Sequence, residues 1–306
     1  MKVFGLTCGR KMGNCEIAVK EALMGAEEVG AEVEIMRLMD LNIKPCRGCE
    51  SCTQKMTKGE PAECAIKGDD MSFVMEKFGQ FDGLILGAPV YFLAPTGYLK
   101  VLNDRMISRD MNFDIDAAKS GEKKRPAGLI SVGGGGWDWG PMGISLMKLL
   151  TFTEFVVVDQ LQVTGAARPG QIVLDEKVME NARRLGRRVA EAIARPAEEL
   201  TFVGDDPGLC PICHSNMVVS GKNWSPAECP ICGAKGTLKL DGDNVVMIVD
   251  EKSLQENRVA LKGRLKHLAE IKNVTERYYA NKDEIQKRMK KYKSYLTYTM
   301  PPSKSK

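Results

Sequence analysis

Residues 84–97 read LILGAPVYFLAPTG, and this stretch decides the fold. Leu84, Ile85 and Leu86 form a short uncharged run that is typical of a buried strand. The two prolines that follow prevent the run from continuing as a helix, and helical spacing resumes from Thr96 to Met106. A buried strand, a turn and a helix make up the repeating unit of a parallel sheet that has helices on both faces.

The same alternation extends along the chain on both sides of this unit. The predicted strands are Val3–Leu6, Ala31–Met39, Leu84–Leu86, Ala127–Val132 and Phe155–Val163. The predicted helices include Glu16–Val29, one that Asp69 and Asp70 cap and that runs to Phe81, Thr96–Met106 and Asp175–Ala194. Five strands in this pattern predict an α/β fold with a doubly wound parallel sheet in the order 2-1-3-4-5.

The composition changes after Arg195-Pro196, and further parts are predicted beyond the α/β domain. The predicted parts are the α/β domain 1–197 with a cysteine-rich loop 42–68, a small cysteine module 203–250, a basic amphipathic helix 251–299 and a disordered tail 300–306. The apolar stripe of the helix is expected to pack against the α/β domain or a second subunit.

Charge and hydropathy indicate a cytoplasmic protein. The net charge is +4, but Glu251 to Lys306 carries 15 Lys and Arg against 6 Asp and Glu. That segment is therefore +9 and the rest of the chain −5. The longest uncharged run, residues 83–99, contains two prolines and cannot form a membrane-spanning helix, and the N-terminus does not resemble a signal peptide.

The loop between the first strand and the first helix is rich in glycine and basic residues. It runs from Thr7 to Cys15 as TCGRKMGNC. Small residues let backbone N–H groups close around a phosphate, the helix N-terminus adds a favourable dipole, and Arg10 or Lys11 adds positive charge. The alternative is an ordinary glycine-rich turn.

Two further loops leave the same edge of the predicted sheet. In residues 88–97, Tyr91 and Phe92 offer a flat apolar wall to a cofactor ring, unless both are core side chains. Residues 133–140 read GGGGWDWG. The glycines permit close approach of a ligand, and the tryptophans either cover a ring or pack on the loop. Because ligands bind beyond the carboxyl ends of parallel strands, the three loops predict one cofactor site.

Together these residues resemble the family of NADPH-dependent FMN reductases and iron–sulfur flavoproteins, which has a flavodoxin-like fold. The resemblance rests on residues 10–16 (RKMGNCE), on residues 88–105 and on the glycine run after the fourth strand, and it covers roughly residues 1–195. It implies FMN as cofactor, and the FMN-binding residues that it implies are Thr7, Gly9, Arg10, Gly13, Asn14, Cys15, Pro89, Val90, Tyr91, Phe92, Gly133, Gly134, Gly135, Gly136 and Trp137.

Four cysteines in the predicted loop 42–68, which we call the loop cysteines, have the spacing of a metal site. Two residues separate Cys46 from Cys49 and Cys49 from Cys52, and Cys64 follows after eleven more. Two-residue spacers let thiolates converge on one cubane, so a 4Fe–4S cluster beside the flavin is expected, as the resemblance also implies. A zinc site or a thiol pair are the alternatives.

Four more cysteines, which we call the ribbon cysteines, form two knuckles fifteen residues apart: Cys210-Pro-Ile-Cys213 and Cys229-Pro-Ile-Cys232. This spacing is typical of a tetrahedral four-thiolate site. The stretch resembles zinc ribbons and rubredoxin-like modules, which share the same ligand geometry, so the site is expected to hold zinc or iron, with zinc preferred. His214 is interpreted as a bystander.

The expected function is that of an FMN-dependent oxidoreductase that exchanges electrons between the flavin and a 4Fe–4S cluster in an anaerobe. Neither histidine, His214 or His267, lies in the α/β domain, so the flavin itself is expected to carry the chemistry. Ferredoxin or another electron carrier is the expected partner, and the resembled family implies a homodimer or homotetramer.

Two other functions remain open. One is an NAD(P)H-dependent FMN or quinone reductase whose cysteines only hold structure. The other is a redox-responsive regulator that binds nucleic acid through the basic helix. The regulator ranks last because the sequence has no helix-turn-helix pattern.

Overall fold

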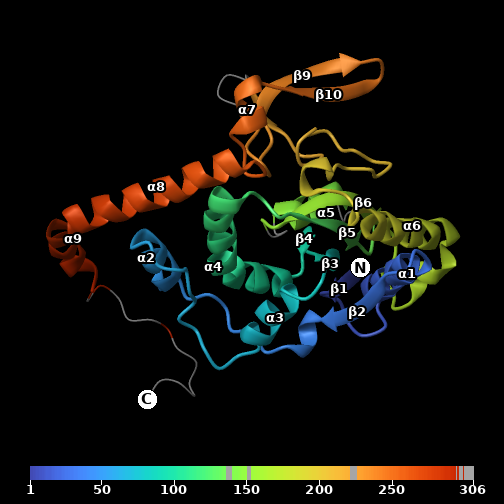
Figure 1. Cartoon of the computed structure of the whole chain (residues 1–306), viewed down its shortest axis with the longest axis horizontal. Helices are drawn as coiled ribbons and strands as arrows, with labels where there is room; N and C mark the ends of the chain where they lie inside the picture. The colour runs from blue at the N-terminus through green and yellow to red at the C-terminus, as the bar shows by residue number, and fades with distance from the viewer. Residues whose placement is uncertain (136–139, 150–152, 221–225, 294, 296–298, 300–306) are drawn as a thin grey trace. The chain divides into compact units, whose positions relative to one another are not determined.

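The computed structural model describes residues 1–135, 140–149, 153–220, 226–293, 295 and 299 (Figure 1). Its contacts divide it into two units, Met1–Leu265 and Lys266–Lys306. The predicted tail 300–306 and two predicted flavin-site residues, Gly136 and Trp137, lie outside the described residues.

The first unit is built on a parallel sheet with the strand order β2-β1-β3-β5-β6. Its strands are β1 (Lys2–Thr7), β2 (Glu32–Arg37), β3 (Gly83–Tyr91), β5 (Arg125–Val132) and β6 (Phe155–Val163). The main helices beside it are α1 (Asn14–Glu28), α3 (Met71–Phe78), α4 (Gly97–Ser120), α5 (Gly140–Leu149) and α6 (Glu176–Ala192). The predicted flavodoxin-like order of five parallel strands is confirmed.

Alternate residues of each strand enter two separate cores, because side chains along a strand point to opposite faces. On β3, Leu84 and Leu86 pack with side chains of α3 and α4, while Ile85 packs with those of α1 and α6. Helices α1 and α6 approach backbone to backbone: a Cβ on Gly186 would lie 1.6 Å from the carbonyl oxygen of Ala22. Both faces are thus covered, and the carboxyl ends of the strands remain as the edge where loops build a site.

β3 is longer than predicted and turns back on itself. It pairs antiparallel with β4 (Ala94–Pro95) through a two-residue turn, in which Phe92 and Leu93 have left-handed φ values of 53° and 68°. Such turns usually contain Asn-Gly, since bulky residues are disfavoured at positive φ. The sequence therefore gave no hairpin signal, and residues 88–97 were expected to be a loop.

The predicted position of the α3 cap is confirmed, but Asp70 makes no capping hydrogen bond. Asp70 occupies the N-cap position without a side-chain bond to the helix. Its carboxylate instead accepts a hydrogen bond from the N–H of Asn42 at 2.7 Å. The carboxylate of Asp69 accepts one from the N–H of Lys44 at 3.1 Å and lies 3.4 Å from the N–H of Met71. The two carboxylates thus close the base of the cysteine-rich loop.

The connecting segments of the first unit contain short elements. These are η1 (Leu38–Asp40), α2 (Ser51–Thr57) within the cysteine-rich loop, η2 (Gln171–Leu174) and η3 (Ala197–Glu199). The ribbon that follows is an antiparallel sheet in the order β10-β9-β8-β7. Its strands are β7 (Val219–Ser220), β8 (Ala227–Glu228), β9 (Lys235–Asp241) and β10 (Asn244–Val249). Its small core consists of the ribbon cysteines with a few apolar side chains.

The predicted helix 251–299 is present as a long helix with breaks, not as one continuous element. Its parts are α7 (Glu251–Gln255), α8 (Leu261–Ala280), α9 (Lys282–Met289) and η5 (Lys290–Tyr292). The buried side chain of Asn257 makes the first break, because it donates to the carbonyl of Ser253 at 2.7 Å and accepts from the N–H groups of Val259 and Ala260 at 2.8 and 3.0 Å. One amide thereby ends α7 and starts α8.

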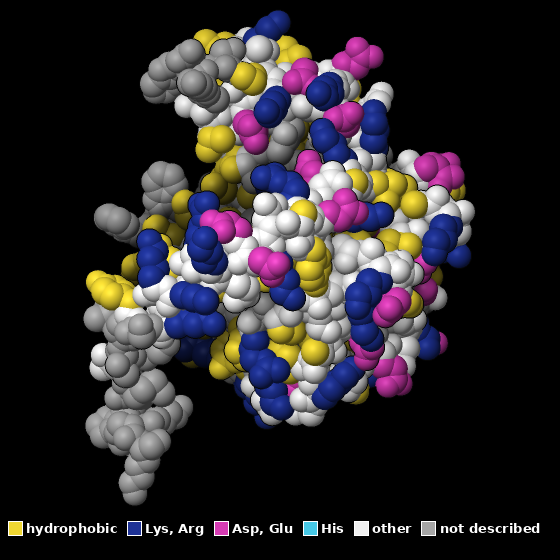
Figure 2. All heavy atoms as spheres, turned by 90° about the vertical axis from the view of Figure 1, so that its left-hand side faces the viewer, with side chains coloured by type: hydrophobic (Ala, Val, Ile, Leu, Met, Phe, Trp, Pro, Cys, Tyr) yellow, Lys and Arg dark blue, Asp and Glu magenta, His cyan; other side chains and the backbone are white. Residues whose placement is uncertain are grey.

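No described helix combines the length and the apolar character that crossing a membrane would require. On the face in Figure 2, Lys and Arg side chains are interspersed with Asp and Glu, and hydrophobic side chains are visible between them. Several members of the predicted apolar stripe of the second unit are exposed, among them Val274, Tyr278, Met289 and Tyr292.

Candidate flavin and metal sites

The loop between β1 and α1 forms a tight cradle at the N-terminus of α1. Gly13 occupies the N-cap position, and no side chain caps α1. A Cβ on Gly13 would lie 2.8 Å from Cγ of Arg10, and a Cβ on Gly9 would lie 3.0 Å from Cβ of Cys15. The hydroxyl of buried Thr7 accepts a bond from the N–H of Gly9 at 3.4 Å. A glycine-rich loop at a helix N-terminus that no side chain caps suits the phosphate of FMN.

Two of the predicted phosphate contacts use their side chains to hold a second loop. Asn14 donates to two carbonyls of loop 166–172 at 2.7 and 2.8 Å and accepts from the N–H of Ile172 at 3.2 Å. Arg10 donates to the carbonyl of Ala167 at 3.2 Å. Because its amide is fully engaged, Asn14 is placed to contact a phosphate through its backbone N–H.

The two cysteines of the cradle are packing residues. Both are buried. Burial raises the pKa of the Cys8 thiol well above its ordinary value and raises that of Cys15 to about 12. Neither thiol is therefore ionised near neutral pH, and neither is activated as a nucleophile.

The β3–β4 hairpin carries the predicted ring wall. Pro89 and Val90 are buried at the end of β3, whereas Tyr91 is about half exposed and Phe92 is completely exposed. The N–H of Thr96 donates to the carbonyl of Pro89 at 3.0 Å and closes the hairpin. The two aromatics are thus not core side chains, and they stand at the carboxyl end of β3, where a flat ligand can reach them.

The glycine-rich loop after β5 lies at the same edge. The N–H of Gly133 donates to the carbonyl of Val163 at 2.8 Å, and its own carbonyl accepts from Ala166 at 3.1 Å. Gly133 is buried, Gly134 is exposed and Gly135 is half-buried. Since loop 166–172 is also bonded to the β1–α1 cradle, these bonds connect two of the predicted loops into one site wall.

The loop cysteines do not form a compact group around a single metal ion. Cys46 and Cys49 are exposed, and Cys52 and Cys64 are half-buried. Among the described residues, no three of these sulfurs form a compact ligand group. Partial burial raises the pKa of Cys52, and the thiols of Cys64 and Cys46 add smaller contributions in the same direction. Cys52 is therefore within electrostatic range of both Cys46 and Cys64.

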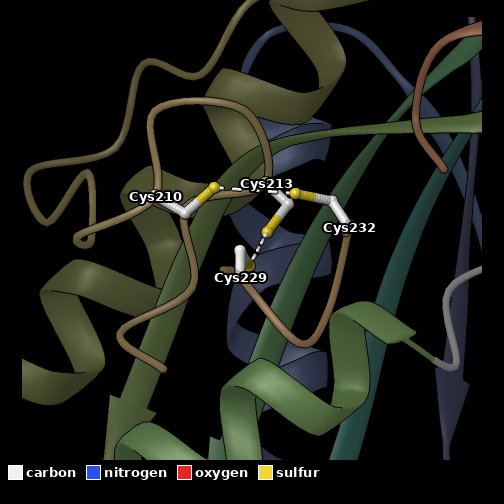
Figure 3. Close-up of side chains that lie close together, drawn as sticks. All are labelled: Cys210, Cys213, Cys229 and Cys232. Carbon is white, nitrogen blue, oxygen red and sulfur yellow. Dashed lines mark hydrogen bonds between the residues drawn. The ribbon is translucent and has the colours of Figure 1, made fainter. Parts of the chain in front are cut away.

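The ribbon cysteines do form a compact group (Figure 3). All four are buried, and their sulfurs lie within 4.8 Å of one another. The Sγ atoms of Cys210 and Cys232 are 3.6 Å apart, and those of Cys213 and Cys229 are 3.5 Å apart. Zinc–thiolate bonds of about 2.3 Å in a tetrahedron place sulfurs about 3.8 Å apart, so this group fits one tetrahedral metal ion.

The ribbon cysteines share their protons unequally. Hydrogen bonds among the four thiols lower the pKa of Cys229 and that of Cys210, the latter to about 7, and raise the pKa values of Cys213 and Cys232. A thiolate is the form that binds a metal. The neighbouring His214 is stacked on Phe202 with ring centroids 4.2 Å apart, and its Nδ1 contacts the carbonyl of Pro207 at 2.9 Å. The imidazole is thereby occupied away from the sulfurs.

A residue that was not predicted from the sequence joins the ribbon to the α/β domain, which we call the flavin domain from here on. Lys148 of α5 is buried and donates its ammonium group to the carbonyl of His214. Burial lowers the pKa of Lys148 to about 8, against the opposing influence of the nearby thiols. The N–H of Asn216 also contacts the hydroxyl of Ser145 at 3.4 Å. A single lysine within the apolar run 142–149 is the signal that would have found this contact.

Known proteins show the family. A family model described as NADPH-dependent FMN reductase matches residues 1–168, more than half of the chain. The chain belongs to this family. Membership makes the protein a flavin-dependent oxidoreductase, in agreement with the expectation from sequence, and it supports FMN as the cofactor.

The similar proteins include an iron–sulfur flavoprotein and two proteins whose names refer to flavones. The chain is 32% identical to an iron–sulfur flavoprotein of Methanocaldococcus jannaschii over 63% of its own length and 97% of that protein. It is 28% identical to a flavone synthase of Aspergillus candidus over 89% of its length and 88% of that protein. The chain also resembles the solved structure of a flavone reductase, with a TM-score of 0.75 and 25% sequence identity. The alignment covers 98% of this chain and 100% of the flavone reductase chain.

Proposed function

We propose that the protein is an FMN-dependent oxidoreductase in which the loop cysteines hold a 4Fe–4S cluster that exchanges electrons with the flavin. The observation that carries this proposal is the way in which the base of the cysteine-rich loop is anchored. The side chain of Arg105 bonds that base to α4, the helix that begins directly after the β3–β4 hairpin. Arg105 lies eight residues from the start of α4. The anchor of the loop is therefore about 12 Å along the helix from the end that adjoins the hairpin. The similarity to iron–sulfur flavoproteins supports the same assignment.

The residues of the flavin edge have roles that follow from their contacts. FMN supplies hydride or single-electron transfer when bound, and a 4Fe–4S cluster supplies single electrons. The β1–α1 cradle would bind the phosphate, and loop 166–172, held by Asn14, would cover it. Tyr91 and Phe92 would face the ring or a substrate stacked on it. Because the thiols of Cys8 and Cys15 stay protonated, they would add no competing nucleophile.

We propose structural zinc for the ribbon cysteines. The ribbon has few apolar side chains beyond its cysteines, and a module of this size usually needs a metal to fold. The buried sulfurs and their spacing fit one tetrahedral ion, as described above.

A second function is favoured by the flavone reductase structure, because the likeness covers 98% of the chain and so extends well beyond the flavin domain. In this alternative, NAD(P)H reduces the flavin, and the flavin reduces a planar conjugated substrate that stacks near the exposed Phe92. The loop cysteines would then have a structural role only.

One experiment separates the two functions. Anaerobically purified protein is analysed for FMN, iron, acid-labile sulfide and zinc, and flavin reduction is followed by stopped flow with NADPH or with reduced ferredoxin. Four iron and four sulfide atoms per chain, with faster reduction by ferredoxin, support the electron-transfer function. Stoichiometric FMN without sulfide, and rapid reduction by NADPH, reject it in favour of the alternative. A protein that binds no FMN rejects both.

We also propose that the protein works as a homodimer or homotetramer with ferredoxin or a similar carrier as partner. The exposed apolar side chains of α8 and α9 support self-association, because monomers rarely leave a continuous apolar stripe in water. Light scattering of the full chain tests this proposal, and a monomer at micromolar concentration would contradict it.

A further inference from the structure

Arg105 is a buried cation that the flavin domain directs at the cysteine-rich loop. Its side chain is 1% exposed and pairs with the carboxylate of Asp69, which is 2% exposed. Its Nη1 also donates to the carbonyl of Lys44 at 2.7 Å, and its Nη2 donates to that of Ile66 at 3.4 Å. One guanidinium therefore holds the residue two positions before Cys46 and the residue two positions after Cys64.

These bonds explain how the long spacer of the loop cysteines is accommodated. Eleven residues separate Cys52 from Cys64, but the two ends of the loop meet at Arg105 whatever the length between them. A second contact holds the spacer itself, because Asn112 of α4 exchanges two hydrogen bonds with the backbone of Ala62 at 2.8 and 3.0 Å. The return of the chain to Cys64 is thus fixed from α4.

One donor of Arg105 is left over. The Nε atom is buried and has no hydrogen-bond partner among the residues that the structure describes. Arg105 and Cys64 line the same cavity, which has a volume of about 500 Å³. The Cys64 side chain and the Arg105 guanidinium therefore share one cavity wall.

We propose that Arg105 is the positioning residue of the loop cysteines: its guanidinium holds Cys64 in place as the fourth ligand and donates its remaining N–H toward the cluster sulfur. This inference rests on the proposed 4Fe–4S function. Donors and charges around ligand sulfurs set both the affinity and the reduction potential of a metal centre. The positive charge stabilises the more negative, reduced form of the cluster, so its loss lowers the potential.

The test compares Arg105→Gln, Arg105→Lys and Cys64→Ser in the full chain after anaerobic reconstitution with iron and sulfide. Arg109→Lys is the matched control. Arg109 lies one turn further along α4, and its Nε donates to the carboxylate of Glu154 at 2.7 Å instead of to the backbone of the cysteine-rich loop. The readouts are iron and sulfide per FMN and the midpoint potential of the cluster. Bound FMN and the thermal unfolding midpoint report whether the fold is intact.

We expect Arg105→Gln to lower cluster affinity about 10-fold and to shift the potential of the remaining cluster to more negative values, with FMN content unchanged. Arg105→Lys keeps the charge, so it should lose affinity but preserve more of the potential. The double variant Arg105→Gln/Cys64→Ser should lose no more cluster than Cys64→Ser alone. Unchanged iron content and potential in Arg105→Gln would overturn the inference, whereas a wild-type protein that takes up no iron and sulfide would overturn the proposed function as well.

Discussion

The loop cysteines and the ribbon cysteines share the C-x-x-C spacing, yet their sulfurs lie in opposite surroundings. The ribbon sulfurs are buried and within 4.8 Å of one another, so they form the centre of a small core. The loop sulfurs are exposed or half-buried, and the hydrogen bonds that hold this loop are found at its base. Equal spacing therefore serves two purposes: in the ribbon the cysteines themselves form the centre of a small core, whereas in the loop an already folded domain positions the cysteines.

The strongest way to break this comparison is to remove one ligand from each set. Cys229→Ser should abolish zinc binding and unfold the ribbon, because metal binding contributes on the order of 10 kcal/mol to such modules. Cys49→Ser is the matched change in the loop and should leave the unfolding midpoint of the chain unchanged. Zinc analysis and calorimetry check both variants. Equal losses of stability would show that both sets are structural.

Packing in the flavin domain should be independent of either cysteine set. In Gly186→Ala, the added methyl group would meet the carbonyl of Ala22 at 1.6 Å and force α1 and α6 apart, which costs about 3 kcal/mol. Gly97→Ala is the control, since nothing lies within 4 Å of the added atom. Denaturant unfolding, with and without a zinc chelator, measures the loss. A loss that appears only in the presence of chelator would link the two regions.

The pH dependence of the two regions should have opposite signs. Burial above all, with the charges of Glu154 and Asp114, raises the pKa of Asp110 to about 6. A carboxyl group whose pKa is higher in the folded state favours folding when protonated, so its contribution is complete below about pH 4 and is lost as the pH rises through 6. The ribbon behaves in the opposite way, because acid protonates its thiolates and releases the metal.

Asp110→Asn should therefore remove the loss of stability between pH 4 and 6 and make the flavin domain more stable at pH 7, by about 2 kcal/mol. Its backbone partner at Thr153, 3.1 Å away, can still donate to the amide oxygen. Unfolding curves between pH 4 and 8 check this. Parallel profiles for the variant and the wild type would refute it.

The smallest expected effect concerns the ring wall. Phe92→Ala should leave the unfolding midpoint almost unchanged, since the side chain is completely exposed. With menadione as a planar probe, the KM should rise about 5-fold at nearly constant kcat, because one aromatic stacking contact contributes about 1 kcal/mol. Phe73→Ala, an exposed phenylalanine on α3, is the control. A drop in kcat alone would mean that Phe92 acts on the flavin instead of on the substrate.

The amino-acid sequence alone was enough to predict the sheet order, the strand-end positions of loops 7–15 and 88–97, and the gathering of the ribbon cysteines. These features depend on local patterns: apolar runs such as Leu84–Leu86 separated by helical spacing, glycines at strand ends, and two knuckles of fixed spacing. Each pattern reports on residues close together in the chain, so no knowledge of distant contacts was needed. The ribbon sulfurs gather as predicted, and their shortest distances join the two knuckles, Cys210 to Cys232 and Cys213 to Cys229.

Only the tertiary structure decided the contacts between segments far apart in the chain. Nothing near Arg105 indicates that it would join Lys44 to Ile66, and nothing near Lys148 except its apolar neighbours indicates that it would reach His214. The turn at Phe92 and the helix break at Asn257 are similar cases, because residues with no local signal there are held in place by pairing or burial. Local sequence sets which elements form, but a buried polar side chain finds its partner only after those elements have packed.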